Sequence, residues 1–204
     1  MKWIVGIDEV GRGPLAGPVC VGMCVAPSDL SDTVWSVINN ARDSKQLWSY
    51  EREYWYKEAE LLSLSGDFFY FTSFVSHAVI DKYGIASAIR LAINRNFSKS
   101  GIDPSDCRVL LDGSLHAPRR FEDQETVIRG DATIPIISFA SIVAKVRRDR
   151  LMNRLAKQFP QYGFELNKGY GTKDHLKALK IHGPCQFHRR SFMTNILAEN
   201  TLLT

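Results

Sequence analysis

The sequence of 204 residues lacks any apolar run near the roughly 20 residues that a membrane-spanning helix requires. It also lacks a basic N-terminal segment followed by an apolar stretch and a small-residue cleavage site, so we expect no signal peptide and a cytoplasmic location. Internal repeats and low-complexity linkers are absent too. These absences favour a globular protein whose length can bury a full core.

Cysteine is scarce, and the spacing of the cysteines does not indicate a metal site. The four cysteines, Cys20, Cys24, Cys107 and Cys185, form no C-x-x-C pair and no zinc-site pattern. Cys20 and Cys24 lie in an apolar, strand-like segment, where cysteine acts as a small hydrophobic residue. We therefore expect reduced, structural thiols.

A strong excess of one charge is also missing, because the formal net charge is only +4. The charge is uneven, at −1 for residues 1–102 and +5 for residues 103–204. The basic half is compatible with a polyanionic partner, but an ordinary solvated surface explains it equally well. With 45% apolar and 24% charged residues, the composition is that of an ordinary globular protein.

Apolar runs and helical periodicity alternate along the chain. We expect strands at 2–8, 17–26, 68–75, 108–111 and 126–129, and helices at 31–41, 49–64, 85–97, 136–159 and 174–181, with a last short helix after Ser191. A loop is expected at 161–172. The order predicts an α/β fold with a mixed sheet, divided into a catalytic domain at 1–160 and a loop and helical extension at 161–204 that packs on it.

Carboxylates follow three of the apolar runs. Asp8-Glu9 end the first run and precede a glycine-rich turn, Gly11-Arg12-Gly13-Pro14, while Asp112 and Asp131 follow two later runs. Acids gathered in one patch repel each other unless a cation is present, and oxygen ligands suit Mg²⁺ or Mn²⁺. Two such ions about 3.5–4 Å apart suit in-line phosphodiester hydrolysis. Asp112-Gly113 and Gly130-Asp131 could each be a simple turn, so spacing alone leaves the four-acid site open.

Seven segments together resemble the ribonuclease HII family of bacteria, in family order. They are Gly6-Ile7-Asp8-Glu9-Val10-Gly11-Arg12-Gly13-Pro14-Leu15-Ala16-Gly17, Asp43-Ser44-Lys45, Leu111-Asp112-Gly113, Gly130-Asp131, Ala140-Ser141-Ile142-Val143-Ala144-Lys145-Val146, Lys168-Gly169-Tyr170-Gly171-Thr172 and His188-Arg189-Arg190-Ser191-Phe192. The resemblance implies a ribonuclease H-like fold with a C-terminal helical segment. It also implies cleavage of the RNA strand of RNA–DNA hybrids and incision 5′ of single ribonucleotides in duplex DNA, leaving a 3′-hydroxyl and a 5′-phosphate.

The resemblance assigns roles to the acids and to the sugar-binding groups. It implies that Asp8, Glu9, Asp112 and Asp131 bind two divalent ions, Mg²⁺ or Mn²⁺. The backbone of Gly11, Arg12 and Gly13 would read the ribose 2′-hydroxyl, the group that distinguishes RNA from DNA. Tyr170 would pack against the next sugar, although a loop aromatic that packs on the domain is the simpler interpretation of that residue alone.

Five further polar residues are candidates for contacts with substrate phosphates. They are Ser44, Lys45, Lys145, Arg189 and Arg190. Lys145 could equally form an i,i+4 pair with Asp149. We expect His188 to be structural rather than a general base, because a metal site removes the need for one.

Two positions depart from the family pattern. Gln46 stands where a second lysine is common, and Phe139 stands where a small residue is expected. We expect a monomer. Two alternative functions are a non-catalytic nucleic-acid-binding module and a general two-metal DNA nuclease. Cleavage that is lost with a chelator would distinguish an enzyme from the binding module, and an all-DNA duplex as substrate would identify the general nuclease.

Overall fold

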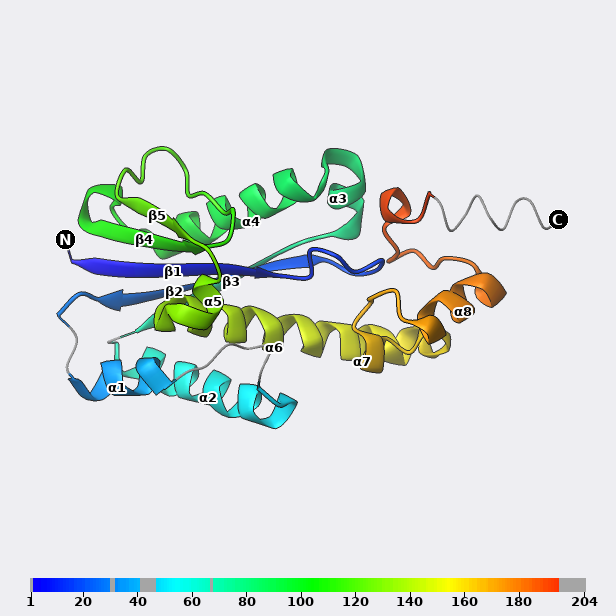
Figure 1. Ribbon diagram of the computed structural model, residues 1–204, viewed down its shortest axis with the longest axis horizontal. Helices are drawn as coiled ribbons and strands as arrows, with labels where there is room; N and C mark the ends of the chain where they lie inside the picture. The colour runs from blue at the N-terminus through cyan, green and yellow to red at the C-terminus, as the bar shows by residue number, and fades with distance from the viewer. Residues whose placement is uncertain (1, 30–31, 41–46, 67, 195–204) are drawn as a thin grey trace.

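Five strands form one mixed sheet at the centre of the computed structural model, which describes residues 2–29, 32–40, 47–66 and 68–194 (Figure 1). They are β1 (Trp3–Val10), β2 (Val19–Pro27), β3 (Phe69–Val75), β4 (Cys107–Asp112) and β5 (Gln124–Val127), in the order β3-β2-β1-β4-β5. β2 runs antiparallel to β1 and β3, whereas β4 runs parallel to β1 and β5. The expected mixed sheet is confirmed.

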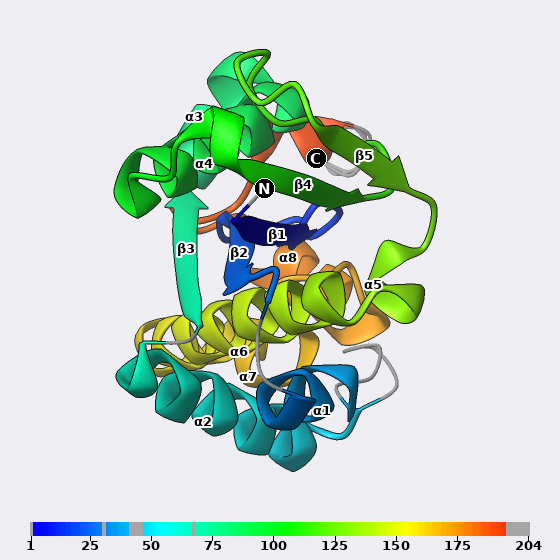
Figure 2. The same cartoon turned by 90° about the vertical axis from the view of Figure 1, so that its left-hand side faces the viewer.

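Helices lie on both faces of the sheet, and the end-on view in Figure 2 shows the layers. One face carries α3 (His77–Tyr83) and α4 (Ile85–Ser100), and the other carries the long α6 (Pro135–Gln158), which in turn contacts α1 (Asp32–Asn40) and α2 (Ser49–Ser65). The remaining elements are α5 (Gly130–Thr133), α7 (Phe164–Asn167), α8 (Lys173–His182) and the 3-10 turns at Pro104–Asp106, Pro160–Tyr162 and Arg190–Phe192. No helix of the described part of the chain is long and apolar enough to cross a bilayer.

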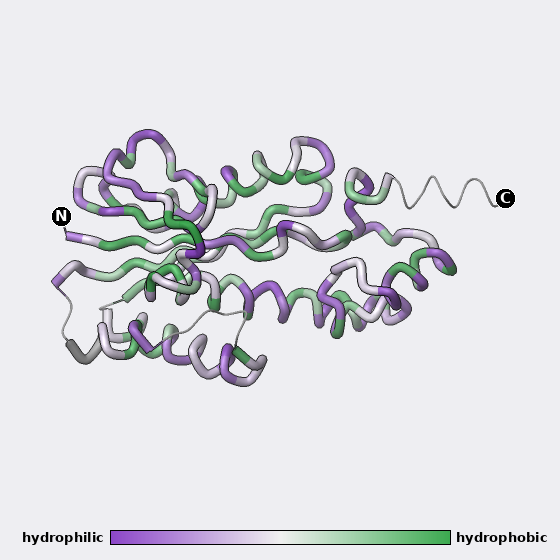
Figure 3. Tube along the Cα trace, viewed as in Figure 1, coloured by the Kyte–Doolittle hydropathy of each residue, from purple (hydrophilic) through white to green (hydrophobic). Residues whose placement is uncertain are grey.

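Strand alternation divides the core between the two faces. On β1, Val5 and Ile7 pack on the side of α4, while Ile4 packs on the side of α6. Side chains on a strand point alternately to opposite faces, so Asp8 shares the α6 face with Ile4. Hydrophobic residues are concentrated along these central strands (Figure 3).

Two glycines on the α6 face allow this helix to lie against the sheet. A Cβ on Gly22 would be 2.1 Å from the carbonyl oxygen of Ala140, and one on Gly6 would be 2.5 Å from the carbonyl of Ile136. Gly22 also pairs with Asp8 across β1 and β2. The missing side chains therefore bring α6 next to the first carboxylate.

The C-terminal segment packs on the far end of α6 through its own apolar cluster. That cluster includes Met152, Leu155, Tyr162, Phe164 and Met193. The segment therefore shares α6 with the sheet. The short helix expected after Ser191 falls largely outside the described residues, and the described part up to residue 194 contains only the 3-10 turn Arg190–Phe192 in this region.

Several expected boundaries were wrong. The strand expected at 126–129 ends at Val127, and Gly130-Asp131 opens helix α5 instead of closing a strand. The reason is local, because Arg129 adopts a left-handed conformation (φ 56°) that turns the chain into a helix. Helix α3 was not expected, and the loop expected at 161–172 contains a 3-10 turn and α7.

Candidate active site

Asp8 and Asp112 come from neighbouring parallel strands. Ile7 of β1 pairs with Leu111 of β4, and the two aspartates are the next residues on their strands. Asp131 joins them from the first turn of α5, and its backbone N–H donates a hydrogen bond to Asp112 Oδ1 at 3.2 Å. One carboxylate oxygen from each of the three aspartates lies within 4.8 Å of the other two.

Burial and repulsion both act on Asp8. It is 4% exposed, and burial, together with the neighbouring Glu9 and Asp112 carboxylates, raises its pKa well above the usual range. Hydrogen bonds from Ser141 of α6 and from the Glu9 N–H (2.7 Å) partly offset this shift, because they stabilise the carboxylate. The charged form of Asp8 is therefore costly without a cation nearby.

The donor set of this cluster fits a hard divalent cation. It consists of carboxylate oxygens, with no sulfur or imidazole among the three clustered ligands. A positive ion between them would offset the burial penalty and the carboxylate repulsion that together raise the Asp8 pKa. Zn²⁺, which is bound mostly by sulfur and nitrogen ligands, fits this all-oxygen set less well.

Glu9 lies beside this cluster but differs from the three aspartates. Its Oε1 is 3.2 Å from Arg12 Nη1, and Glu9 is not among the clustered ligands. Because it follows Asp8 on a strand, its side chain starts toward the opposite face. Its role as a fourth metal ligand stays a prediction.

A groove of about 480 Å³ runs past the carboxylates. Its lining combines Asp8, Glu9 and Asp112 with the glycine-rich turn, cationic side chains and Tyr170, and the full set is Asp8, Glu9, Val10, Gly11, Arg12, Gly13, Arg52, Asp112, Ser141, Lys145 and Tyr170. Tyr170 is 43% exposed, so its ring is accessible in the groove. A Cβ placed on Gly13 would be 4.0 Å from Tyr170 Cε1, which shows that the turn and the ring face each other.

Two buried arginines lie behind the glycine-rich turn and the residues that follow it. The Arg189 guanidinium donates to the carbonyl oxygens of Gly17 (2.9 Å), Arg12 (2.9 Å) and Gly11 (2.7 Å). Arg148 of α6 donates to Pro18 (2.9 Å), Lys168 (2.9 Å) and Ala16 (3.2 Å). Both arginines are 0% exposed, and burial lowers the pKa of each.

Gly11 is required by this packing. It has φ +90°, and a Cβ there would be 2.2 Å from Arg148 Nε. A side chain at this position would therefore strain the backbone and displace the guanidinium.

The predicted phosphate contacts have different outcomes. The contact predicted for Arg189 is wrong, because its guanidinium is buried and bonded to the turn. Arg190 is exposed, and its backbone N–H donates to Asp81 Oδ2. Ser44 and Lys45, and also Gln46, lie outside the described residues.

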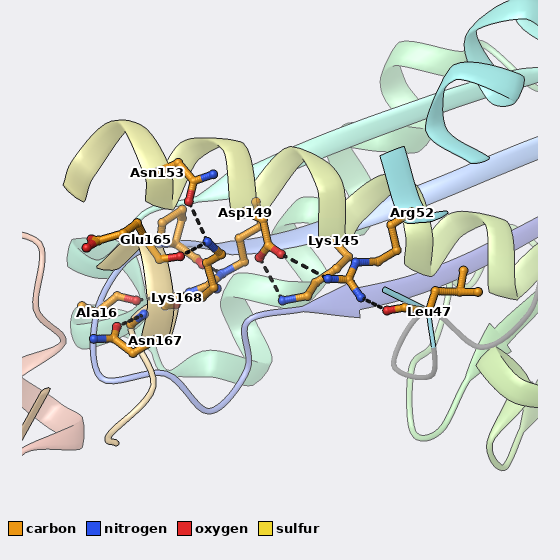
Figure 4. A network of polar contacts seen from close by, with 12 residues as sticks. Ala16, Leu47, Arg52, Lys145, Asp149, Asn153, Glu165, Asn167 and Lys168 are labelled. Atoms are coloured by element: carbon orange, nitrogen blue, oxygen red, sulfur yellow. Dashed lines mark hydrogen bonds and ion pairs between the residues drawn. The ribbon is translucent and has the colours of Figure 1, made fainter. Parts of the chain in front are cut away.

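Lys145 lines the groove and also forms its expected ion pair. Lys145 Nζ lies 2.9 Å from Asp149 Oδ1, and Asp149 Oδ2 lies 3.9 Å from an Arg52 nitrogen (Figure 4). Arg52 also donates to the Leu47 carbonyl oxygen at 2.5 Å. Asp149 thus holds two cationic side chains along one wall of the groove.

From the sequence, no role in the site was predicted for three residues that line the groove or support it, namely Arg52, Ser141 and Arg148. Arg148 carried a usable signal, since it is spaced by four from Ala144 and Met152, both buried on the apolar stripe of α6. Phe139, the departure from the family pattern, is buried edge-on against Trp55 and Phe68.

The fold and the site define a class, namely a nuclease-type α/β protein with a cluster of carboxylates suited to a metal ion beside a groove lined by cationic side chains. Comparison with known proteins narrows the class. The family model described as "Ribonuclease HII" matches residues 5–195. A ribonuclease HII from Endomicrobium trichonymphae is 40% identical over 201 residues, which cover 98% of this chain and 90% of the relative. The chain belongs to the ribonuclease HII family.

Solved structures agree in fold. Ribonuclease H2 from Pyrococcus horikoshii superposes with a TM-score of 0.73 at 24% identity, covering 98% of this chain and 99% of that one. Bst-RNase HIII in complex with Mn²⁺ superposes with a TM-score of 0.67 at 14% identity, covering 99% of this chain and 70% of that one. At these identities, the similarity establishes the ribonuclease H-like fold.

Arg189→Lys should destabilise the protein by about 1.5–3 kcal/mol, because one ammonium cannot replace hydrogen bonds from a guanidinium to three carbonyls. Chemical denaturation of the variant and the wild type measures the change. Arg190→Lys is the matched control, since the neighbouring side chain is exposed. Equal unfolding free energies for the two variants would contradict the role of Arg189.

Asp8→Asn should stabilise the metal-free protein at pH 7–8. The raised pKa of Asp8 means that its contribution is favourable below its unfolded pKa and is lost as pH rises through the folded pKa, and the neutral amide avoids this loss. Added Mg²⁺ or Mn²⁺ should raise the melting temperature of the wild type more than that of the variant. Thermal unfolding with EDTA or with metal measures both effects, and identical metal-induced shifts would count against Asp8 as a ligand.

Proposed function

We propose that the chain is a metal-dependent endoribonuclease that hydrolyses the RNA strand of RNA–DNA hybrids and incises 5′ of single ribonucleotides in duplex DNA. The carrying observation is one groove that holds both a carboxylate cluster and, facing each other, a bare-backbone turn and an exposed tyrosine. The cluster supplies the chemistry of phosphodiester hydrolysis, and the turn and ring supply a means to recognise a sugar.

The metal ligands in this proposal are Asp8, Asp112 and Asp131, with Glu9 as a fourth. The cofactor is Mg²⁺ or Mn²⁺, two ions per site, and a relative with the same fold is described in complex with Mn²⁺. When bound, such ions supply Lewis acidity to the phosphodiester and neutralise charge in the site. The hydrogen bonds from Ser141 to Asp8 and from the Asp131 N–H to Asp112 keep the carboxylates oriented toward the cluster.

In this proposal, the cationic wall of the groove binds the phosphate backbone. Lys145 and Arg52 lie on the same groove as the carboxylates, and Asp149 limits the freedom of both side chains. Cations held in place by a neighbouring carboxylate lose less side-chain entropy when a phosphate binds. Arg190, Ser44 and Lys45 remain proposed contacts with substrate phosphates.

The glycine-rich turn reads the ribose in this proposal. Arg189 engages the carbonyls of Gly11 and Arg12, which leaves the backbone N–H groups of the turn and the Gly13 carbonyl to meet a 2′-hydroxyl that both donates and accepts. Tyr170, opposite Gly13, provides a flat surface for the following deoxyribose.

A labelled duplex that carries one ribonucleotide tests the function. Incubation with Mg²⁺, with Mn²⁺ or with EDTA should give a single cut 5′ of the ribonucleotide with metal and none with chelator. Products should carry a 3′-hydroxyl and a 5′-phosphate. Binding without cleavage would indicate a binding module, and cleavage of an all-DNA duplex would indicate a general nuclease.

Tyr170→Ala should reduce incision at a single embedded ribonucleotide more than cleavage of a uniform hybrid. The physical reason is that, in this proposal, the ring contacts the sugar on the DNA side of the junction. Loss of such an aromatic contact should lower kcat/KM on the single-ribonucleotide substrate about tenfold. Ratios of kcat/KM on the two substrates measure the effect, with Tyr170→Phe as the control that keeps the ring. An equal loss on both substrates would contradict a role in junction recognition.

A further inference from the structure

Two buried histidines connect the C-terminal segment to Tyr170. His175 of α8 and His188 approach through their Nε2 atoms, 3.0 Å apart. At one end, His175 Nδ1 lies 2.8 Å from the carbonyl oxygen of Tyr170. At the other end, the Cys185 N–H donates to His188 Nδ1 at 3.0 Å. The four groups form one continuous chain of hydrogen bonds.

The proton positions in this chain follow from its backbone end at Tyr170. A carbonyl oxygen only accepts, so His175 Nδ1 must carry a proton and, in the neutral ring, Nε2 must accept. His188 Nε2 then carries the donated proton, and His188 Nδ1 is free to accept from the Cys185 N–H. The 3.3 Å approach of His188 Nδ1 to the Cys185 carbonyl is the longer contact and is not needed as a hydrogen bond.

The surroundings favour two neutral rings. His175 is 0% exposed and His188 is 2% exposed, and the rings of Tyr162 and Phe164 pack against both. Burial lowers the pKa of both histidines, that of His188 to about 4, with His77 and His175 adding repulsion. An imidazolium on either ring would place two N–H groups against each other and break the chain.

Arg189, the residue that follows His188, holds the wall of the groove opposite Tyr170, which is the glycine-rich turn. Arg189 bonds to the carbonyls of Gly11 and Arg12, while His188 pairs with Ala16 in an antiparallel bridge. His188 and Arg189 therefore act on the two opposing walls, Arg189 on the glycine-rich turn and His188, through His175, on Tyr170.

We propose that His175 and His188 are positioning residues that set the place of Tyr170 opposite Gly13, and so help the protein to distinguish an RNA–DNA junction from a uniform hybrid. This inference rests on the proposed function, in which Tyr170 contacts the sugar after the ribonucleotide. Neither histidine touches the reacting atoms. Their effect is on substrate selectivity, while the carboxylate cluster is unaffected.

Two substitutions at His175 each remove one of its two side-chain hydrogen bonds and keep the other. The amide nitrogen of asparagine occupies the place of Nδ1. His175→Asn therefore keeps the hydrogen bond to the Tyr170 carbonyl and loses the hydrogen bond from His188. The amide oxygen of glutamine reaches the place of Nε2. His175→Gln therefore keeps the hydrogen bond from His188 and loses the hydrogen bond to the Tyr170 carbonyl. The two variants are closely matched in polarity, and thermal unfolding reports any general loss of stability in each.

The measured quantity is the ratio of kcat/KM on a duplex with one ribonucleotide to kcat/KM on a uniform hybrid. We expect His175→Gln to lower this ratio about three- to tenfold, the equivalent of one lost hydrogen bond, and His175→Asn to lower it less. In the Tyr170→Ala background, His175→Gln should have no additional effect on the ratio. A ratio that stays at the wild-type value in His175→Gln, or an equal change in both variants, would overturn the proposal.

A spectroscopic test does not depend on activity or on folding of the variants. In ¹⁵N spectra of the wild-type imidazoles at pH 7, His175 should be the Nδ1–H tautomer and His188 the Nε2–H tautomer. The opposite tautomers, or a charged ring, would overturn the hydrogen-bond chain. If the wild type fails to incise at an embedded ribonucleotide, the proposed function fails while the tautomers still report on the chain.

Discussion

Two buried guanidinium groups are the constraint on which the substrate groove depends. Among the described residues, the nitrogens of Arg148 and Arg189 donate to six backbone carbonyls, and neither arginine forms an ion pair with a carboxylate. Burying a cation in this way is costly, and for Arg189 burial and the nearby Arg148 lower the pKa to about 9. The hydrogen bonds offset this cost only while the accepting carbonyls stay in place. Arg189 therefore holds the conformation of the glycine-rich turn, and Arg148 holds that of Ala16 and Pro18, which follow the turn.

The opposite charge problem lies on the other side of the turn. Three aspartates approach each other within 4.8 Å, and burial, together with repulsion from the Glu9 and Asp112 carboxylates, raises the pKa of Asp8. The protein therefore carries buried cations behind the turn and a cluster of carboxylates beside the groove, two of which, Asp8 and Asp112, line it. Both arrangements are typical of sites that are built for ligands rather than for stability, because a bound cation relieves the carboxylates and the arginines fix the binding surface.

Much of the fold and part of the site could be predicted from the sequence. Apolar runs located the five strands, and helical periodicity located α6 to within one residue at each end. The carboxylates stood out because each follows an apolar run. Asp131 was predicted in the site, but the element that carries it was predicted wrongly, since a left-handed Arg129, rather than a strand end, turns it toward Asp112. Arg189 was misassigned, because its sequence context resembles an exposed basic stretch and gives no indication of burial.

By itself, the sequence determined the chemistry that is available: a set of acids, a turn without side chains and a family-specific order of motifs. Only the tertiary structure decided which groups meet. Gly22 and Gly6 let α6 approach the sheet closely enough for Ser141 to reach Asp8, and the C-terminal segment folds back so that His188 and Arg189 reach opposite walls of one groove. The hydrogen bonds of Arg189 to Gly11 and Gly17 join residues more than 100 positions apart. Local propensity carries no information about them, because burial and hydrogen bonding are properties of the packed chain.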